Sequence, residues 1–132
     1  MHAVIQFTQS PIAIPEAHTV SREIGAIVEF HGIVRELEQG HPLAGLHYEA
    51  YEPMAVLQLE RIFQQLHTQS PVAEVTFLHR LGWVPVGHAS LYLRVRSSHR
   101  AEAFAFCSAA IEAMKRDVPI WKLQRPLPPD AC

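Results

Sequence analysis

A stripe of apolar residues at helical spacing, ended by a proline, constrains the fold of this chain more than any other feature. Between His99 and Arg116 the apolar residues recur every three or four positions, which predicts a helix with one buried face. The predicted stripe comprises Ala103, Phe104, Cys107, Ala110, Ile111 and Met114. Pro119 prevents the helix from continuing, because proline lacks an amide hydrogen and its ring clashes with the preceding turn. The apolar face of this helix must therefore pack against another layer.

A second helix and several strands are predicted to supply that layer. Pro53–His67 follows the same helical template, with a buried stripe of Leu59, Ile62, Phe63 and Leu66. Strand patterns occur at His2–Gln9, Gly25–Phe30, Leu43–Tyr51, Val72–Leu81, Ala89–Arg96 and, more briefly, Ile120–Leu123. In the fifth of these strands, alternation places Leu91, Leu93 and Val95 on one face and Tyr92, Arg94 and Arg96 on the other.

The connecting segments complete the predicted organisation. We expect a short helix at Pro15–Glu23, a loop at Glu36–Pro42 and a turn at Gly82–Gly87, each indicated by proline or glycine. The proline-rich segment 126–132 is expected to be a flexible tail. Together these elements predict one α+β domain over residues 1–132, with an antiparallel sheet covered by two long helices.

Composition excludes several classes of protein. The net charge of −2 argues against nucleic-acid binding through bulk charge, and no apolar run is long enough to cross a membrane. The N-terminus lacks the pattern of a signal peptide, and the two cysteines are too few for a disulfide framework. The nine histidines include no pair at metal-ligand spacing, and phosphate-binding glycine loops are absent. We therefore expect a cytoplasmic protein without a metal site.

The chain contains only two lysines, Lys115 and Lys122, which lie seven positions apart. Two amines held close together can supply an acid, a base or a nucleophile near neutral pH. The alternative is that both lysines are structural, since a cation at the C-terminal end of a helix is favourable in any case.

Two further segments are candidate anion sites. Ser97-Ser98-His99-Arg100 lies where a strand ends and a helix begins, so free amides and the helix dipole would favour an anion there. The alternative is that Ser98 is only an N-cap. Arg35 follows a strand and could bind an anion, or it could pair with Glu36 or Glu38.

Five short motifs occur in a fixed order between Gly25 and Lys122. They are Gly25-Ala26…Phe30-x-Gly32-x-Val34-Arg35, Tyr48-Glu49-x-Tyr51-x-x-Met54-Ala55, His79-Arg80-x-Gly82, Ser98-His99-Arg100-x-x-x-Phe104 and Lys115-x-x-x-Pro119-Ile120-Trp121-Lys122. This ordered set resembles the large, catalytic subunit of molybdopterin synthase. The resemblance implies an α/β-hammerhead fold with an added antiparallel layer.

The resemblance also implies an activity and its partners. Members of that family convert cyclic pyranopterin monophosphate into molybdopterin by installing two dithiolene sulfurs, in the synthesis of the molybdenum cofactor. The sulfur arrives on the C-terminal Gly-Gly thiocarboxylate of a small ubiquitin-like subunit, and no metal or organic cofactor is required. The assembly is a heterotetramer built around a dimer of large subunits.

The resemblance assigns roles to eleven residues by position. Lys115 and Lys122 would be the catalytic lysines, and Phe30 and Met114 would line the pocket. The substrate-binding residues would be Ile33, Val34, Arg35, His99, Arg100, Leu123 and Gln124, with His99 and Arg100 contributed across the dimer interface.

Two departures from the family pattern leave alternatives open. Leu123-Gln124 stands where the family commonly has a basic residue and a glutamate, and the chain stops at Cys132, short of the tail of many relatives. One alternative is a non-catalytic module that binds a ubiquitin-like partner or a phosphate ligand. Another is an unrelated anion-binding protein whose two lysines are structural.

Overall fold

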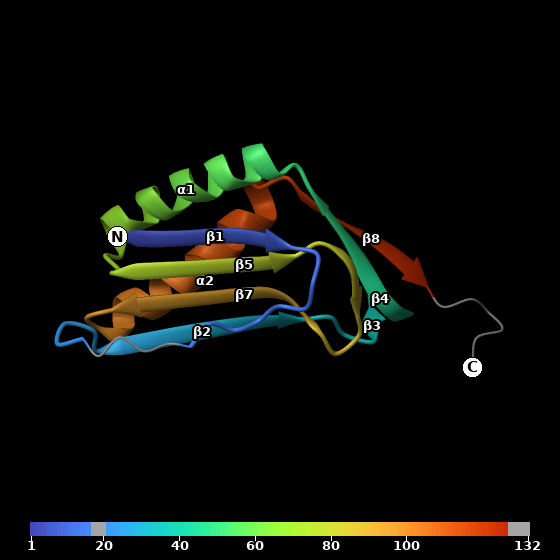
Figure 1. Cartoon of the computed structure of the whole chain (residues 1–132), viewed down its shortest axis with the longest axis horizontal. Helices are drawn as coiled ribbons and strands as arrows, with labels where there is room; N and C mark the ends of the chain where they lie inside the picture. The colour runs from blue at the N-terminus through green and yellow to red at the C-terminus, as the bar shows by residue number, and fades with distance from the viewer. Residues whose placement is uncertain (17–20, 127–132) are drawn as a thin grey trace.

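The structure is a computed structural model that describes residues 1–16 and 21–126, with side chains through residue 123. Within those ranges the chain forms eight strands and two helices. They are arranged in layers (Figure 1). In chain order the elements are β1 (His2–Thr8), β2 (Ala26–Ile33), β3 (Leu37–Glu38), β4 (His41–Ala50), α1 (Glu52–Gln69), β5 (Glu74–Arg80), β6 (Gly82–Pro85), β7 (Ala89–Ser97), α2 (Arg100–Asp117) and β8 (Ile120–Pro126).

The larger sheet has the strand order β1-β5-β7-β2, and both helices pack on one of its faces (Figure 1). β5 and β2 each pair antiparallel with β7, whereas β1 pairs parallel with β5. The main core lies between this sheet and the helices, where Phe77 and Leu93 from the strands pack with Phe63 of α1 and Phe106 of α2. Burial of these large side chains is the main source of stability in this layer.

The smaller sheet is organised around β4, which pairs antiparallel with β3, β6 and β8. Figure 1 shows β4 and β8 running side by side, obliquely to the strands of the larger sheet. A second core beneath them contains Val34, Leu43, Leu46 and Val84. The α+β prediction is confirmed, and the junction of the two sheets is where the chemistry-bearing residues collect.

The helix predicted at Pro15–Glu23 is wrong for every residue of that segment that the structure describes, while 17–20 lie outside the described residues. The carbonyl of Pro15 accepts a hydrogen bond from Arg94 Nη1 at 3.2 Å instead of one from a following helical turn. Farther along, the amide of Glu23 donates to Ser21 Oγ at 3.1 Å. Side chains thus satisfy backbone groups that a helix would have used.

Two predicted connections are in fact strands. The expected loop at Glu36–Pro42 contains β3 and a tight hairpin, in which Gln39 and Gly40 have φ values of 52° and 78°. Two consecutive positive φ values give the turn that suits the twist of paired strands. The expected turn at Gly82–Gly87 contains β6, whose backbone pairs with β4. β3 is only two residues long, too short to show a strand alternation, and the pairing of β6 with β4 joins segments that are far apart in the sequence.

Four of the six residues in the predicted stripe of α2 are buried. Ala103, Cys107, Ala110 and Met114 are buried as expected, but Phe104 is 60% exposed and Ile111 is only partly buried. Phe106 and Ala113 are buried in their place. Alanines lie on both sides of the row of residues that was correctly predicted as buried. Periodicity alone therefore did not decide which neighbouring residues also face the sheet.

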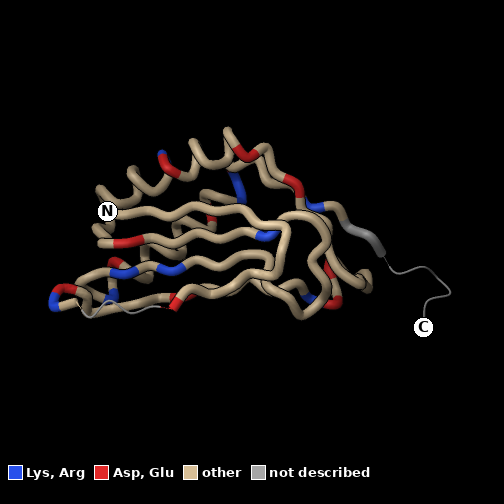
Figure 2. Tube along the Cα trace, viewed as in Figure 1, with Lys and Arg blue, Asp and Glu red and all other residues tan. Residues whose placement is uncertain are grey.

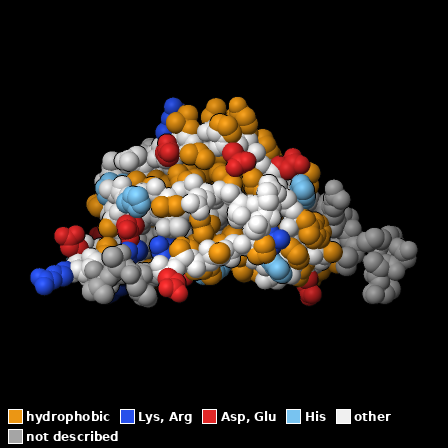
Figure 3. All heavy atoms as spheres, in the orientation of Figure 1, with side chains coloured by type: hydrophobic (Ala, Val, Ile, Leu, Met, Phe, Trp, Pro, Cys, Tyr) orange, Lys and Arg blue, Asp and Glu red, His pale blue; other side chains and the backbone are white. Residues whose placement is uncertain are grey.

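Over the described residues, the surface carries charges of both signs. Figure 2 shows Lys and Arg interspersed with Asp and Glu along the described trace. Figure 3 shows hydrophobic side chains over α1 at the top of the view, with acidic side chains nearby. No helix among the described residues is long and apolar enough to cross a membrane.

The tail expected at 126–132 lies outside the described residues except for Pro126, which ends β8 opposite Leu43.

Candidate functional site

A cavity of about 540 Å³ opens where the C-terminal turn of α2 meets the end of β2 and the smaller sheet. Of the eleven residues to which the resemblance assigned roles, seven line this cavity: Phe30, Ile33, Val34, Arg35, Met114, Lys115 and Lys122. Apolar groups form part of its wall and three permanent cations lie around it, which is a combination suited to a ligand that is both cyclic and anionic.

The two lysines reach this cavity from different elements. Lys115 lies in the last turn of α2, and the chain leaves the helix at Val118 because Pro119 follows. The Pro119 carbonyl accepts a hydrogen bond from the amide of Tyr51 at 3.2 Å, and β8 then pairs with β4 so that Lys122 lies opposite Tyr48. A short helix-to-strand connection therefore brings both amines to one cavity.

Glu38 contributes a carboxylate to the same cavity. Its Oε1 accepts a hydrogen bond from Lys122 Nζ, and its side chain is only 14% exposed. The sequence had suggested Glu38 only as a partner for Arg35. Within the part of the chain that the structure describes, Arg35 forms no ion pair with Glu36 or with Glu38. The strand pairing of β3 and β4, which local pattern did not reveal, is what directs Glu38 toward Lys122.

His79 is a buried titratable group in the wall of the cavity. Its side chain is packed against the Tyr48 ring, with ring centroids 5.1 Å apart, and its Nδ1 lies 2.8 Å from the carbonyl oxygen of Arg80. A carbonyl can only accept, so Nδ1 carries the hydrogen and Nε2 carries the lone pair. Burial lowers the pKa of His79 from 6.5 to about 4. The imidazole is therefore neutral at physiological pH, a property that its motif position did not indicate.

The other four residues to which the resemblance assigned roles do not line the cavity. His99 is the N-cap residue of α2, at the end of the helix opposite Lys115, so the alternative that Ser98 is the N-cap is wrong. Arg100 is the first helical residue and is exposed. On β8, Leu123 is 50% exposed and the backbone of Gln124 pairs with Leu46, while the Gln124 side chain lies outside the described part.

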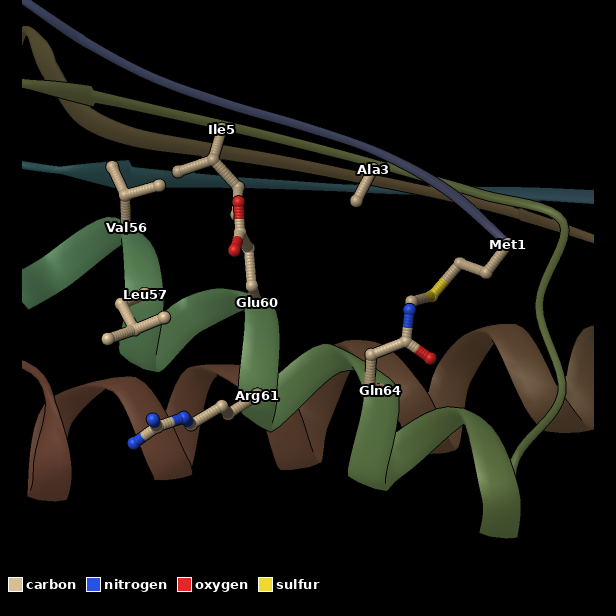
Figure 4. Close-up of a pocket in the computed structure, with 8 residues that line it drawn as sticks. All are labelled: Met1, Ala3, Ile5, Val56, Leu57, Glu60, Arg61 and Gln64. Carbon is tan, nitrogen blue, oxygen red and sulfur yellow. The ribbon is translucent and has the colours of Figure 1, made fainter.

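A larger hollow of about 690 Å³ lies between β1 and α1 (Figure 4). Its wall contains one carboxylate, Glu60, and one guanidinium, Arg61, with apolar side chains such as Ile5 and Val56. In Figure 4 the Glu60 side chain points toward Ile5, whereas the Arg61 side chain points away from it. This hollow gathers no set of cations, so we assign the candidate site to the cavity at the sheet junction.

The described residues contain no group of three or more histidine, cysteine, aspartate or glutamate side chains that could hold a metal ion.

The fold and the cavity define a small α+β protein in which one cavity combines cationic and apolar side chains. A family model described as MoaE protein matches residues 7–117, and the chain belongs to this family. The resemblance inferred from the ordered motifs is thereby confirmed.

Individual relatives agree with this assignment. The chain is 39% identical over 121 residues to the "molybdopterin synthase catalytic subunit" of Bos taurus, covering 90% of this chain and 64% of the relative. It is 43% identical over 101 residues to the protein of the same name from Bacillus subtilis, covering 76% of this chain and 64% of the relative. The chain thus spans slightly less than two thirds of the length of these curated relatives.

Solved structures extend the comparison to the whole fold. Molybdopterin synthase from Staphylococcus aureus superposes with a TM-score of 0.81 and 33% identity, covering 96% of this chain and 90% of that chain. A Helicobacter pylori structure described as a complex of subunits 1 and 2 of molybdopterin-converting factor gives a TM-score of 0.67 at 25% identity, covering 83% and 74%.

Proposed function

We propose that the chain is the catalytic subunit of a molybdopterin synthase. It transfers sulfur from the thiocarboxylated C-terminus of a small ubiquitin-like subunit to cyclic pyranopterin monophosphate, forming the dithiolene of molybdopterin. The observation that carries this proposal is the cavity that gathers Lys115, Lys122 and Arg35. The names of the bovine and Bacillus subtilis relatives support the same reaction.

The cavity walls suit the two halves of such a substrate. Arg35 follows β2 at the mouth of the cavity and can form a forked, charge-assisted contact with a cyclic phosphate. Phe30 is half-buried and Met114 is buried, and both can pack against a flat pterin ring system. The exposed Ile33 and the buried Val34 form the strand end between these two regions. Leu123 and Gln124 would contact the substrate from β8.

The lysines serve the transfer step in this proposal. When the thiocarboxylate group reacts, negative charge develops on its carbonyl oxygen, and a positioned ammonium stabilises that charge. The sulfur bonds to a carbon of the cyclic substrate in place of an oxygen substituent, and water adds to the acyl carbon, so that the bond between sulfur and the acyl carbon breaks and the partner is left with a C-terminal carboxylate. The second amine can move a proton in these steps. The sulfur donor is the partner's own thiocarboxylate, so the chain needs no metal or organic cofactor for this chemistry.

A second copy of the chain completes the site. Within one chain, His99 and Arg100 lie at the far end of α2 from Lys115, so they can approach the cavity only from another molecule. In a dimer of large subunits, this helix start would supply donors for the pterin or its phosphate. The proposed assembly therefore has a dimeric core with a small subunit at each site, and the Helicobacter pylori complex is a precedent for that pairing.

We place this assembly in the cytoplasm. Cys107 is a free, buried thiol, which suits a reducing compartment.

The test is a reconstituted reaction with the thiocarboxylated partner and the cyclic substrate. The substitutions Lys115→Ala and Lys122→Ala should each lower turnover by about a hundredfold or more. This is the usual effect of removing a group that stabilises the transition state. Arg116→Ala is the matched control, because this exposed cation is adjacent to Lys115 and pairs with Asp117 outside the cavity.

Three other results of this experiment would contradict the proposed function. Parental turnover in both lysine variants would disprove the catalytic assignment. A parent chain that binds the partner's tail without turnover would be the non-catalytic module considered above. A parent chain that does not bind the tail would place the protein outside this function altogether.

A further inference from the structure

We propose that Glu38 is a positioning residue that holds the Lys122 ammonium in its working place, an inference that rests on the proposed sulfur-transfer function. The two side chains come from positions 84 residues apart in the sequence and form an ion pair at the cavity wall. No feature of the resemblance assigned a role to Glu38.

The strand pairing fixes both members of this pair. Glu38 ends β3 opposite His41, at a two-residue hairpin closed by Gln39 and Gly40. Lys122 lies on β8 opposite Tyr48. β4 therefore holds both backbones, so that the Glu38 carboxylate and the Lys122 amine are set by one strand. Because strand pairing already fixes both backbones, forming the ion pair costs side-chain entropy but no further backbone entropy.

The burial of the pair is unequal, and this asymmetry supports a positioning role. The Lys122 side chain is 49% exposed, whereas that of Glu38 is 14% exposed. An exposed lysine without a fixed partner samples many rotamers, because its ammonium is a point charge on a four-carbon stem. A largely buried carboxylate is a fixed acceptor that selects among those rotamers. The carboxylate thus anchors an amine that would otherwise move in solvent.

Charge balance in the cavity points the same way. Among the residues that line it, Glu38 is the single carboxylate, beside the cations Arg35, Lys115 and Lys122. A negative group in a site for an anionic substrate opposes ground-state binding, since like charges repel. Its presence is explained if the carboxylate acts through Lys122 rather than on the substrate. The two residues that follow Lys122, Leu123 and Gln124, carry no carboxylate that could do this.

The kinetic test compares Glu38→Gln with Glu36→Gln in the reconstituted reaction. Glu38→Gln should lower kcat about tenfold while KM for the cyclic substrate stays the same or falls, because a repelling charge is removed. Glu38→Asp keeps the charge on a shorter stem and should recover part of kcat. Glu36 is exposed and does not line the cavity, so Glu36→Gln should match the parent in both constants. A general loss of folding would instead lower the active fraction in every assay.

A double-mutant cycle separates action through Lys122 from an independent role. In the Lys122→Ala background, Glu38→Gln should cause no further loss of kcat, because the group it positions is already gone. An equal tenfold loss in that background would overturn the proposal. Unchanged kcat in Glu38→Gln alone would overturn it as well.

A third measurement does not depend on turnover. The chain has only two lysines, so limited acetylation followed by peptide mass analysis reports each amine separately, with Lys115 as the internal reference. Glu38→Gln should raise the labelling of Lys122 relative to Lys115 severalfold, and Glu36→Gln should not change it. Unchanged labelling would refute the positioning of Lys122 by Glu38, whereas a parent chain without turnover would refute only the proposed function.

Discussion

His99 and Lys115 lie at opposite ends of α2, sixteen positions apart, so about 24 Å of helix separates them. Lys115 lines the cavity at the sheet junction, while His99 and the neighbouring Arg100 are at the far end of the helix. A reaction that uses groups from both ends must therefore take place between two chains. The proposed activity therefore requires a dimer, and this requirement can be tested directly.

Mixing two inactive variants should restore activity if two chains share each site. Arg100→Ala removes a donor from one side and Lys122→Ala removes an amine from the other, so each homodimer lacks a group at both sites. In an equal mixture, half of the dimers are mixed and have one complete site, which gives about a quarter of the parental turnover. Turnover is measured on the co-expressed mixture, and the mixed dimer isolated through two different affinity tags should reach about half of the parental value.

The control for this experiment mixes Lys115→Ala with Lys122→Ala. Both lysines line the cavity from the same chain, so no mixed dimer regains a complete site and activity should stay low. Recovery in this control, or none in the Arg100 and Lys122 mixture, would contradict the shared-site arrangement.

Local pattern was sufficient for most of the helices and strands, because each buries one face at a regular spacing. The alternation in β7 correctly placed Leu91, Leu93 and Val95 in the main core. It did not show that Tyr92 and Arg96, on the opposite face, are also buried. Burial of that face depends on other parts of the chain, and alternation within one strand does not contain that information.

The cations of the candidate site were likewise predicted from local pattern, but their contacts were not. The spacing of Lys115 and Lys122 around Pro119 was enough to place both amines near the helix end. The Glu38–Lys122 contact and the neutral His79 were not predicted, since the first depends on the pairing of β4 with β8 and the second on the pairing of β5 with β7, and both pairings join segments that are far apart in the sequence. Charge type and order along the sequence indicated the cations of the site, while only the three-dimensional pairing revealed what contacts them.

Gly25 should not tolerate a side chain. A Cβ there would collide with the backbone carbonyl oxygen of Ser98, which cannot move without displacing the start of α2. Gly25→Ala should lower the free energy of unfolding by about 2 kcal/mol, as measured by urea denaturation. In Gly32→Ala the nearest atom is Leu91 Cβ at 3.3 Å, so this control should cost less. Equal costs for the two variants would show that the Ser98 contact is relaxed at little expense.

Cys107 should react slowly with thiol reagents in the folded protein. It is buried in the main core, and burial raises the pKa of its thiol, which lowers the fraction of reactive thiolate. In a Cys132→Ser variant at pH 8, a chromogenic disulfide reagent should label Cys107 at least about a hundredfold more slowly in buffer than in concentrated urea. The unfolded sample is the internal control, and equally fast labelling in both would contradict the buried position.

His79 should make stability fall as the solution is acidified from pH 7 to pH 5. Its pKa is about 4 in the folded chain and 6.5 when unfolded, so below pH 6.5 the unfolded state takes up a proton that the folded state does not. The resulting loss is about 2 kcal/mol over this interval, measured by urea denaturation. His79→Gln should remove most of this pH dependence, whereas His41→Gln, at an exposed position, controls for loss of an imidazole. If His79→Gln kept the parental slope, the neutral buried imidazole would not be its source.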